Sequence, residues 1–397
     1  MDSIRWVEIE ELLKEKNLSD KMRFWKQTIE ATKNFSGTSP PSVFVGSFGY
    51  PKVFLGILSP PVQQENADIL DSPEQWYQQK ATIEQVIGYR SEMIYSRFSS
   101  DVKNATGRLV DVTQELAMSK KPSDVEIQLS KNPRFRFGID QHITPVGSPA
   151  NMIQARLVGN LKIERKVDYI VSDVDLKAVG AVARLYNGKI PVSRIQKMMS
   201  AGLLGMKIER KFVPTRWSIT AVDDMLGKII LERVKDYKDL DTVRLFFNEY
   251  IGNQYFVLLV PGAYQYELIE MWNIFGKQSV SSDYEQYWGR KTYARTTAGA
   301  FYAGRLAAME YLDKIKRQAA VLIVRNVTEE YSMPLGIWQL RETVRDAFNK
   351  SYEKFDSMAQ AAKKISEKVG DKWVVESKLL KNMKDQKKIM QFLKKAY

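Results

Sequence analysis

The chain contains no cysteine, and this absence limits how it can fold. Disulfide bridges, thiolate zinc sites and iron–sulfur clusters are all excluded. His142 is the only histidine, so metal sites that need two histidines are excluded as well. The 397 residues, of which 44% are hydrophobic, must therefore fold around an ordinary hydrophobic core.

The net charge of +13 favours a polyanionic partner, because neutralising phosphates releases condensed counterions. DNA, RNA, a nucleotide and an anionic lipid all satisfy this argument, and so does a basic surface with no partner. No apolar run is long enough to span a membrane, and the first residues lack the pattern of a secretory signal. We therefore expect a cytoplasmic protein without a membrane partner.

Helical and strand-like patterns are intermixed along the chain without a regular βαβ order, which favours an α+β fold with mainly antiparallel strands. We expect strands at 43–45, 52–55, 155–172, 210–217, 242–251, 254–260 and 320–325. We expect helices in the first thirty-odd residues and at 72–95, 175–186, 218–235, 297–318 and 336–367, and an aromatic loop at 271–288. The predicted regions are a helical and loop-rich segment at 1–145, a body at 146–370 and a flexible basic tail at 371–397.

The tail contains a spaced set of four residues that resembles the PCNA-interacting peptide, or PIP box. Gln386, Ile389, Phe392 and Leu393 stand at relative positions one, four, seven and eight. One tight turn brings the last three onto one side to fill a hydrophobic pocket, while the glutamine amide forms hydrogen bonds beside it. Leu393 departs from the strongest version of the motif, which has a second aromatic there. The resemblance implies that the PCNA sliding clamp is a partner.

Two other interpretations of the tail stay open. Its apolar residues could line an amphipathic helix that packs on the body, and a basic amphipathic segment could also lie on a membrane surface. The terminal position favours an accessible peptide.

Several segments of the body resemble the archaeal Nre family of DNA-repair proteins. They are Phe48–Pro61, Asp173–Gly180, Gly202–Asp224 and Tyr331–Arg345, and the part from Val213 to Asp224 is the most specific. The resemblance implies an archaeal protein that acts in DNA repair with the clamp, and it implies no particular reaction. Relatives often carry a cysteine-bearing, zinc-module-like segment, and a zinc function does not transfer to this chain.

Residues 213–224 also indicate a phosphate site without reference to any family. Thr215, Arg216 and Ser218 stand at a predicted strand-to-helix junction, with Ser218 as a possible cap. Free amides at a helix start, together with Arg216, suit a phosphate or carboxylate, and so a nucleotide is a possible ligand. The alternative is a capped helix with a structural salt bridge.

Two pairs of carboxylates indicate a site for a divalent cation. Asp173 and Asp175 follow a predicted strand, and Asp223 and Asp224 lie within the next predicted long helix. Such carboxylates can hold Mg²⁺ or Mn²⁺ beside a phosphate, as a nuclease or a nucleotide-processing enzyme requires. Helix caps and ordinary salt bridges explain the four aspartates equally well.

Two further features are compatible with either function or structure. His142, with Asp140 nearby, could act as a base or a ligand, although a lone loop histidine is more often structural. An aromatic and basic cluster could stack bases of DNA or RNA, although dense aromatics more often pack in the core. The cluster comprises Trp272, Tyr284, Tyr287, Trp288 and Tyr293 with Arg290, Lys291 and Arg295.

Overall fold

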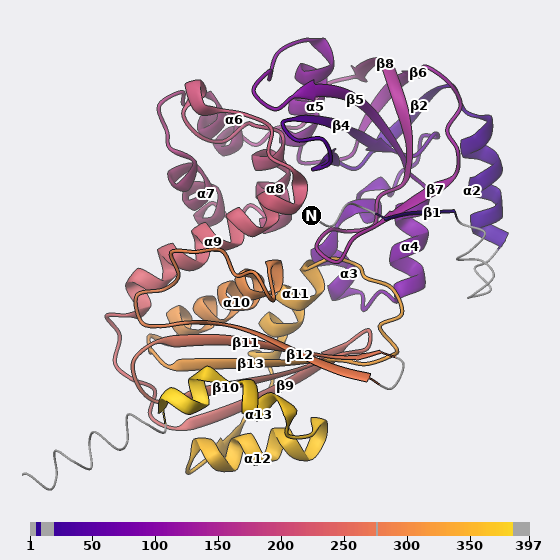
Figure 1. The fold of residues 1–397 in the computed structure, drawn as a ribbon. Coiled ribbons are helices and arrows are strands. Elements are labelled where there is room, and N and C mark those ends of the chain that lie inside the picture. Colours follow the sequence, from indigo (N-terminus) through magenta and orange to yellow (C-terminus); the bar gives the residue numbers. More distant parts are fainter. Residues whose placement is uncertain (1–4, 9–19, 275–276, 384–397) are drawn as a thin grey trace, which may run out of the picture. The chain divides into compact units, whose positions relative to one another are not determined.

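The computed structural model of the protein describes residues 5–8, 20–274 and 277–383. The chain divides into two compact units (Figure 1). Unit 1 contains the residues up to Met225 together with Met333–Trp338, and unit 2 contains Leu226–Ser332 and the residues from Gln339 onward. Both units combine helices with a mixed sheet, so the predicted α+β class is confirmed.

Unit 1 is built on a six-stranded sheet in the order β2-β6-β8-β5-β4-β3. β5 and β8 run parallel, and the other described neighbours in this sheet run antiparallel. The strands are β2 (Asn34–Ser39), β3 (Val43–Val45), β4 (Lys52–Ser59), β5 (Ile94–Asp101), β6 (Ser123–Leu129) and β8 (Ser148–Val158). A separate antiparallel pair joins β1 (Arg5–Glu8) to β7 (Arg136–Ile139).

Successive residues of the inner part of this sheet are apolar and point to opposite faces, and both faces are therefore buried. Val45 and Leu55 pack with Val110 of α5, whereas Phe44 and Leu58 pack in a second cluster. The helices are α2 (Asp20–Ala31), α3 (Pro73–Gln78), α4 (Ile83–Ser91), α5 (Arg108–Met118), α6 (Arg165–Ser172), α7 (Ala178–Asn187) and α8 (Val192–Ser200). Short 3₁₀ turns occupy Ala67–Asp71 and Lys207–Glu209, and α9 (Thr215–Val234) continues from unit 1 into unit 2.

Unit 2 contains a second six-stranded sheet in the order β12-β11-β13-β10-β9-β14. The strands are β9 (Val243–Tyr250), β10 (Asn253–Val260), β11 (Gln265–Ile274), β12 (Lys277–Glu285), β13 (Ala320–Val327) and β14 (Glu353–Phe355). β11 and β13 run parallel, and the other described pairs are antiparallel. β10 and β13 are the apolar central strands, which is expected of strands covered on both faces.

The helices of unit 2 cover both faces of its sheet (Figure 1). α10 (Gly299–Ile315) and α11 (Trp338–Ala347) lie on one side, and α12 (Met358–Val369) and α13 (Lys372–Glu376) lie on the other. Trp373, Leu379 and Leu380 complete the core on the α12 side. The last part of the described chain is therefore packed against the body.

Glu267 of β11 fixes the segment that follows α13. Its carboxylate accepts hydrogen bonds from the Ser377 hydroxyl at 2.7 Å and from the amides of Lys378 and Leu379 at 2.9 and 3.0 Å. These donors are the free groups at the start of a helical stretch at 378–383. The buried acid thus caps this helical stretch from the neighbouring sheet.

Several predicted elements are confirmed and others are wrong. The predicted hairpin around Gly252 is present as β9 and β10, and α10 and β13 match their predictions. The predicted strand 210–217 is wrong, because Pro214 starts α9 at Thr215 and a 3₁₀ turn precedes it. The predicted strands at 155–172 are confirmed only as far as Val158, where β8 ends, because α6 follows, in which Val167 and Ile170 are buried with helical spacing.

Two longer assignments fail for a different reason, namely the position of strands at a sheet edge. The predicted loop 271–288 is largely the β11–β12 hairpin, whose polar edge strand lacks an alternating apolar pattern. The predicted helix 336–367 is divided into α11, edge strand β14 and α12. The predicted helix 72–95 is also wrong, but for another reason: it contains two helices, α3 and α4, and the start of β5, which is an inner strand.

The predicted regional boundary near residue 145 lies inside unit 1.

Gln386, Ile389, Phe392 and Leu393 lie outside the described residues. None of the helices in the described part of the chain has the length and apolar character that a membrane crossing requires.

Candidate functional site

An exposed aromatic turn joins β3 to β4 in unit 1. The backbone of Gly49 adopts a left-handed φ of +79°, and a cis peptide joins Tyr50 to Pro51. Phe48 projects from this turn with 80% of its surface exposed, and Tyr50 is 45% exposed. Exposed rings at a turn point to a binding role when other features of a site surround them.

The start of α9 lies beside this turn, although the two segments are far apart in the chain. The ring centroids of Tyr50 and Trp217 are 5.0 Å apart, and Trp217 is 41% exposed. The amide of Val45 donates a 3.0 Å hydrogen bond to the hydroxyl of Thr215. The fold therefore brings together residues from the Phe48–Pro61 and Gly202–Asp224 segments.

Three exposed lysines come from backbone segments that are hydrogen-bonded to one another near this turn. Val102 donates its amide to the carbonyl of Pro51 at 3.0 Å, and Phe212 donates to the carbonyl of Val102 at 2.9 Å. Lys52, Lys103 and Lys211 are each adjacent to one of these residues. We call the set of Phe48, Tyr50, Trp217, Lys52, Lys103 and Lys211 the aromatic–lysine surface.

The charge of this surface is positive on balance. Asp101 is exposed and pairs in register with Lys52, so it offsets one of the three lysines. Its carboxylate also accepts a 2.9 Å hydrogen bond from the amide of Lys103, which holds the short turn after β5 in place. Cations around exposed rings are the combination that attracts phosphates and stacks bases.

The structure divides the three residues of the predicted phosphate site. Arg216 is partly exposed, and its guanidinium lies 3.7 Å from the carboxylate of Asp140. Thr215 accepts from Val45, and Ser218 is buried and donates its hydroxyl to the carbonyl of Thr215 at 2.9 Å. Ser218 is not the helix cap, because the helix begins three residues earlier. Phosphate binding by these residues stays a prediction, with Arg216 as the residue that reaches the surface.

Asp140, which lies beside Arg216, also forms a hydrogen bond within the loop that holds His142. Its carboxylate accepts a 2.7 Å hydrogen bond from the amide of His142, and the carbonyl of His142 accepts from the amide of Ile337. These contacts order the backbone around the histidine. A chemical role for the His142 side chain stays a prediction.

The four aspartates of the predicted metal site have different surroundings. The carboxylate of Asp173 accepts from the amides of Asp175 and Leu176, as in a turn before a helix, and it lies 3.8 Å from Arg184. Asp223 is buried and accepts a 3.0 Å bond from Gln196. Within the residues that the structure describes, no three histidine, aspartate or glutamate side chains are grouped to hold a metal ion. Binding of Mg²⁺ or Mn²⁺ by these aspartates stays a prediction.

The predicted aromatic cluster is divided between places in unit 2. Trp272 lies on β11 near Arg325, and Tyr284 lies on β12 and accepts from Asn382. These two residues occupy opposite ends of the β11–β12 pair, since Trp272 pairs with Ser279 and Tyr284 pairs with Glu267. The other members share the loop after β12: Tyr287, Trp288, Arg290, Lys291, Tyr293 and Arg295.

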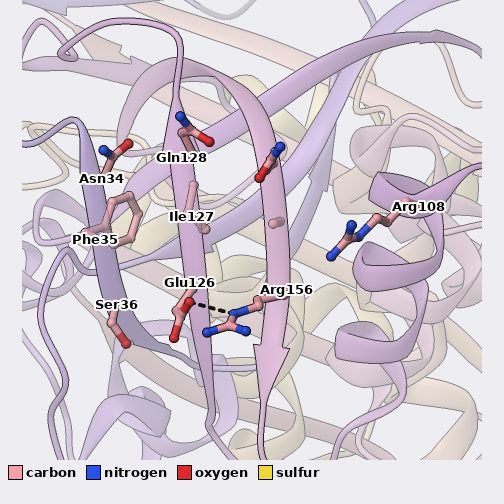
Figure 2. A pocket seen from close by; sticks show the side chains of 10 residues that line it. Asn34, Phe35, Ser36, Arg108, Glu126, Ile127, Gln128 and Arg156 are labelled. Atoms are coloured by element: carbon pink, nitrogen blue, oxygen red, sulfur yellow. Dashed lines mark hydrogen bonds and ion pairs between the residues drawn. The ribbon is translucent and has the colours of Figure 1, made fainter.

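A polar hollow of about 470 Å³ lies on the exposed face of β2, β6 and β8 in unit 1 (Figure 2). Asn34, Gln128 and Gln154 form one row across the three strands, because their positions pair in register. In the next row Arg156 donates to Glu126 at 2.6 Å, and Arg108 of α5 faces the sheet from the side. The lining combines these polar groups with apolar ones such as Phe35, and none of them singles out a particular ligand.

Sequence reasoning alone did not single out Phe48 or the three lysines as site residues. The turn signal around Gly49 and Pro51 was visible, but exposure of a phenylalanine depends on how the turn packs. A buried ion network was missed as well. Asp71 is bound by Arg90 at 2.7 Å and Lys197 at 2.8 Å, and it accepts a short hydrogen bond from Ser42.

Comparison with known proteins identifies relatives along nearly the whole chain. The family description "Archaeal Nre, N-terminal" matches residues 13–277, and "Archaeal Nre, C-terminal" matches residues 285–392. No solved structure matches the chain.

Two relatives illustrate the similarity. DNA repair protein NreB of Archaeoglobus fulgidus is 37% identical over 363 residues, which cover 89% of this chain and 90% of the relative. DNA repair protein NreA of Haloferax volcanii is 35% identical over 356 residues, which cover 86% and 84%. Identity at this level over most of both chains shows common descent and a common fold, and the chain therefore belongs to the archaeal Nre family.

Proposed function

We propose that the protein is a DNA-repair factor that contacts DNA through the aromatic–lysine surface of unit 1. The observation that carries this proposal is that the β3–β4 turn and the start of α9 lie side by side and expose aromatic rings. Phe48 is 80% exposed, and exposed lysines lie near it. The names of the relatives support a role in repair. The net charge of +13 supports a polyanionic partner.

The chemistry of this surface suits DNA with unpaired or distorted bases. Lysines neutralise phosphates without reading the sequence, and so we expect little sequence preference. Each base presents an apolar face that can stack on Phe48 or on the Tyr50 and Trp217 rings, and such stacking is sequence-tolerant. Bases in an intact duplex are already stacked, so damaged or single-stranded DNA exposes more of the required surface.

Recruitment by the PCNA clamp is the second part of the proposal. Gln386, Ile389, Phe392 and Leu393 have the spacing of a clamp-binding peptide. Met383 is the last described residue, and its segment is fixed to unit 2 through Glu267 and Leu380. The peptide therefore starts three residues beyond an anchored part of the chain.

The DNA contact is tested by removing three positive charges. The variant Lys52→Gln, Lys103→Gln, Lys211→Gln should weaken binding to a fluorescent single-stranded oligonucleotide by about tenfold or more. The slope of log affinity against log salt should fall by about 0.7 for each phosphate that the variant no longer neutralises. The variant Phe48→Ala should weaken binding with little change in the salt slope, because it removes stacking and no charge.

A matched control removes the same charge from exposed lysines of unit 2, in the variant Lys363→Gln, Lys368→Gln, Lys372→Gln. If the control and the surface variant lose equal affinity, the interaction is general electrostatics and the assigned surface is wrong. Absence of DNA binding by the wild-type protein at low salt would remove the DNA-binding proposal altogether.

The clamp contact is tested by calorimetric titration of purified PCNA. The double variant Ile389→Ala, Phe392→Ala should bind at least about a hundredfold more weakly, because two of the three residues that fill the hydrophobic pocket are truncated. Met390→Ala is the matched control, since it shortens an apolar side chain at a variable position of the motif. Wild-type affinity in the double variant would refute the clamp assignment.

A further inference from the structure

The loop between β12 and α10 in unit 2 exposes two large rings. Trp288 is 80% exposed and Tyr293 is 50% exposed. Lys291 and Arg295 are exposed in the same loop, and residues 286–298 contain no acidic residue. We call residues 286–298 the Trp288 loop.

Hydrogen bonds from the inside of the unit hold this loop in one conformation. The guanidinium of Arg290 donates to the carboxylate of Asp283 at 3.0 Å and to the carbonyls of Thr292 and Tyr293. The other oxygen of Asp283 accepts from the amides of Thr296 and Thr297 at 2.9 and 2.7 Å. The loop has no regular structure, yet Arg290 in its middle and the amides at its C-terminal end are fixed to one buried carboxylate.

The rings of Tyr287 and Trp288 are also supported from the body. Their centroids lie 5.0 Å apart in an edge-to-face arrangement, and the ammonium of Lys235 lies 5.5 Å from each ring. Lys235 directly follows the last residue of α9, and its side chain is only 9% exposed. A side chain fixed in this way supports the two rings from the body of the unit. Trp288 nevertheless leaves most of its surface in solvent, an arrangement that costs hydration free energy unless a ligand covers the ring.

We propose that the Trp288 loop is a second DNA contact that stacks an unpaired base of single-stranded DNA on Trp288. Lys291 and Arg295 would neutralise the phosphates on either side of that base. The loop combines a fixed ring, two exposed cations and no acidic side chain, and this combination favours a nucleic acid over an acidic or apolar protein surface. The inference rests on the proposed DNA-binding function, but it concerns another unit and other residues.

The experiment compares variants of the full chain on a single-stranded oligonucleotide, its duplex and an RNA of the same sequence. Trp288→Ala should weaken binding to single-stranded DNA about tenfold and leave duplex binding unchanged. Trp288→Phe should retain most of the affinity, because it keeps an aromatic face. The fluorescence quenching that accompanies binding should be smaller in Trp288→Phe by the contribution of this tryptophan.

A charge variant gives an independent test of the same loop. Lys291→Gln with Arg295→Gln should lower the salt slope, whereas Lys363→Gln with Lys372→Gln is the control of equal charge change in unit 2. Melting curves should coincide for all these variants, since every substituted side chain is exposed.

The outcomes separate this inference from the proposed function. In one outcome, wild type binds DNA and the unit 1 variants bind it more weakly, but Trp288→Ala binds as tightly as wild type. The Trp288 loop inference is then overturned, and the unit 1 contact stands. If wild type binds no DNA, both are overturned. Tighter binding of RNA than of single-stranded DNA, with the same dependence on Trp288, would overturn the assignment of the loop to DNA.

Discussion

At the scale of single residues, Asp71 is a charged group of unit 1 that is held by three side chains. It is buried between Arg90 and Lys197, and it also accepts from Ser42. Burial opposes its ionisation, but the two neighbouring cations outweigh that effect and lower the pKa of Asp71 to about 2. The carboxylate is therefore charged at neutral pH and compensates the buried Arg90 and the partly buried Lys197.

Replacing Asp71 with Asn should destabilise the protein by about 3–5 kcal/mol, because the buried Arg90 and the partly buried Lys197 would lose their partner charge. Urea unfolding at pH 7 measures this loss. The folded pKa of Asp71 lies below its unfolded value, so its contribution is present above about pH 4 and is lost as pH falls toward 2. Wild type should show this loss on acidification, and Asp71→Asn should lack that part. A variant with wild-type stability at pH 7 would contradict the argument.

The sequence reveals residue types but not their contacts. The sequence predicts that Thr215, Arg216 and Ser218 lie at a helix start, where anions can bind, and they do lie at a helix start. Their individual roles depended on where the helix begins. Pro214 sets that start at Thr215, which turns the Ser218 hydroxyl back onto the helix and leaves Arg216 partly exposed beside Asp140.

At the scale of elements, strong turn signals were predictive, and so was the apolar edge strand β3, but polar edge strands were not. The hairpin of β9 and β10 could be predicted because apolar strands flank Gly252. β12 and β14 could not, because an edge strand is stabilised by hydrogen bonds to its neighbour and needs no apolar pattern of its own. The same limit concealed the fact that Tyr284 lies on a strand, the edge strand β12.

Glu267 provides a test of how one element is attached to another. Glu267→Gln should increase hydrogen exchange of the amides at 378–383 about tenfold or more, since a neutral amide has one acceptor oxygen for the three donors that the carboxylate serves. Exchange in the central strands β10 and β13 should stay slow. Ser377→Ala is the milder control, because both backbone hydrogen bonds to Glu267 remain. Equal protection at 378–383 in wild type and Glu267→Gln would show that apolar packing alone holds this segment.

At the scale of the whole molecule, chain order and spatial order differ. Met333–Trp338 returns to unit 1, where the carbonyl of His142 accepts from Ile337 and the Trp338 ring lies 5.4 Å from that of Trp76. A boundary predicted from composition assumes continuous regions, and so it could not identify this return. The two family descriptions meet near β12, which is also not where the compact units divide.

The attachment of residues 377–380 to β11 also sets a mechanical limit on the proposed complex with the clamp. Whatever their conformation, three residues span at most about 11 Å, so Gln386 cannot move farther than that from Met383. This three-residue connection would keep unit 2 close to the clamp at a high effective concentration. Even weak contacts between the two protein surfaces would then be populated. The clamp would then hold unit 2 within a short distance of its own surface and would restrict which DNA the protein can reach.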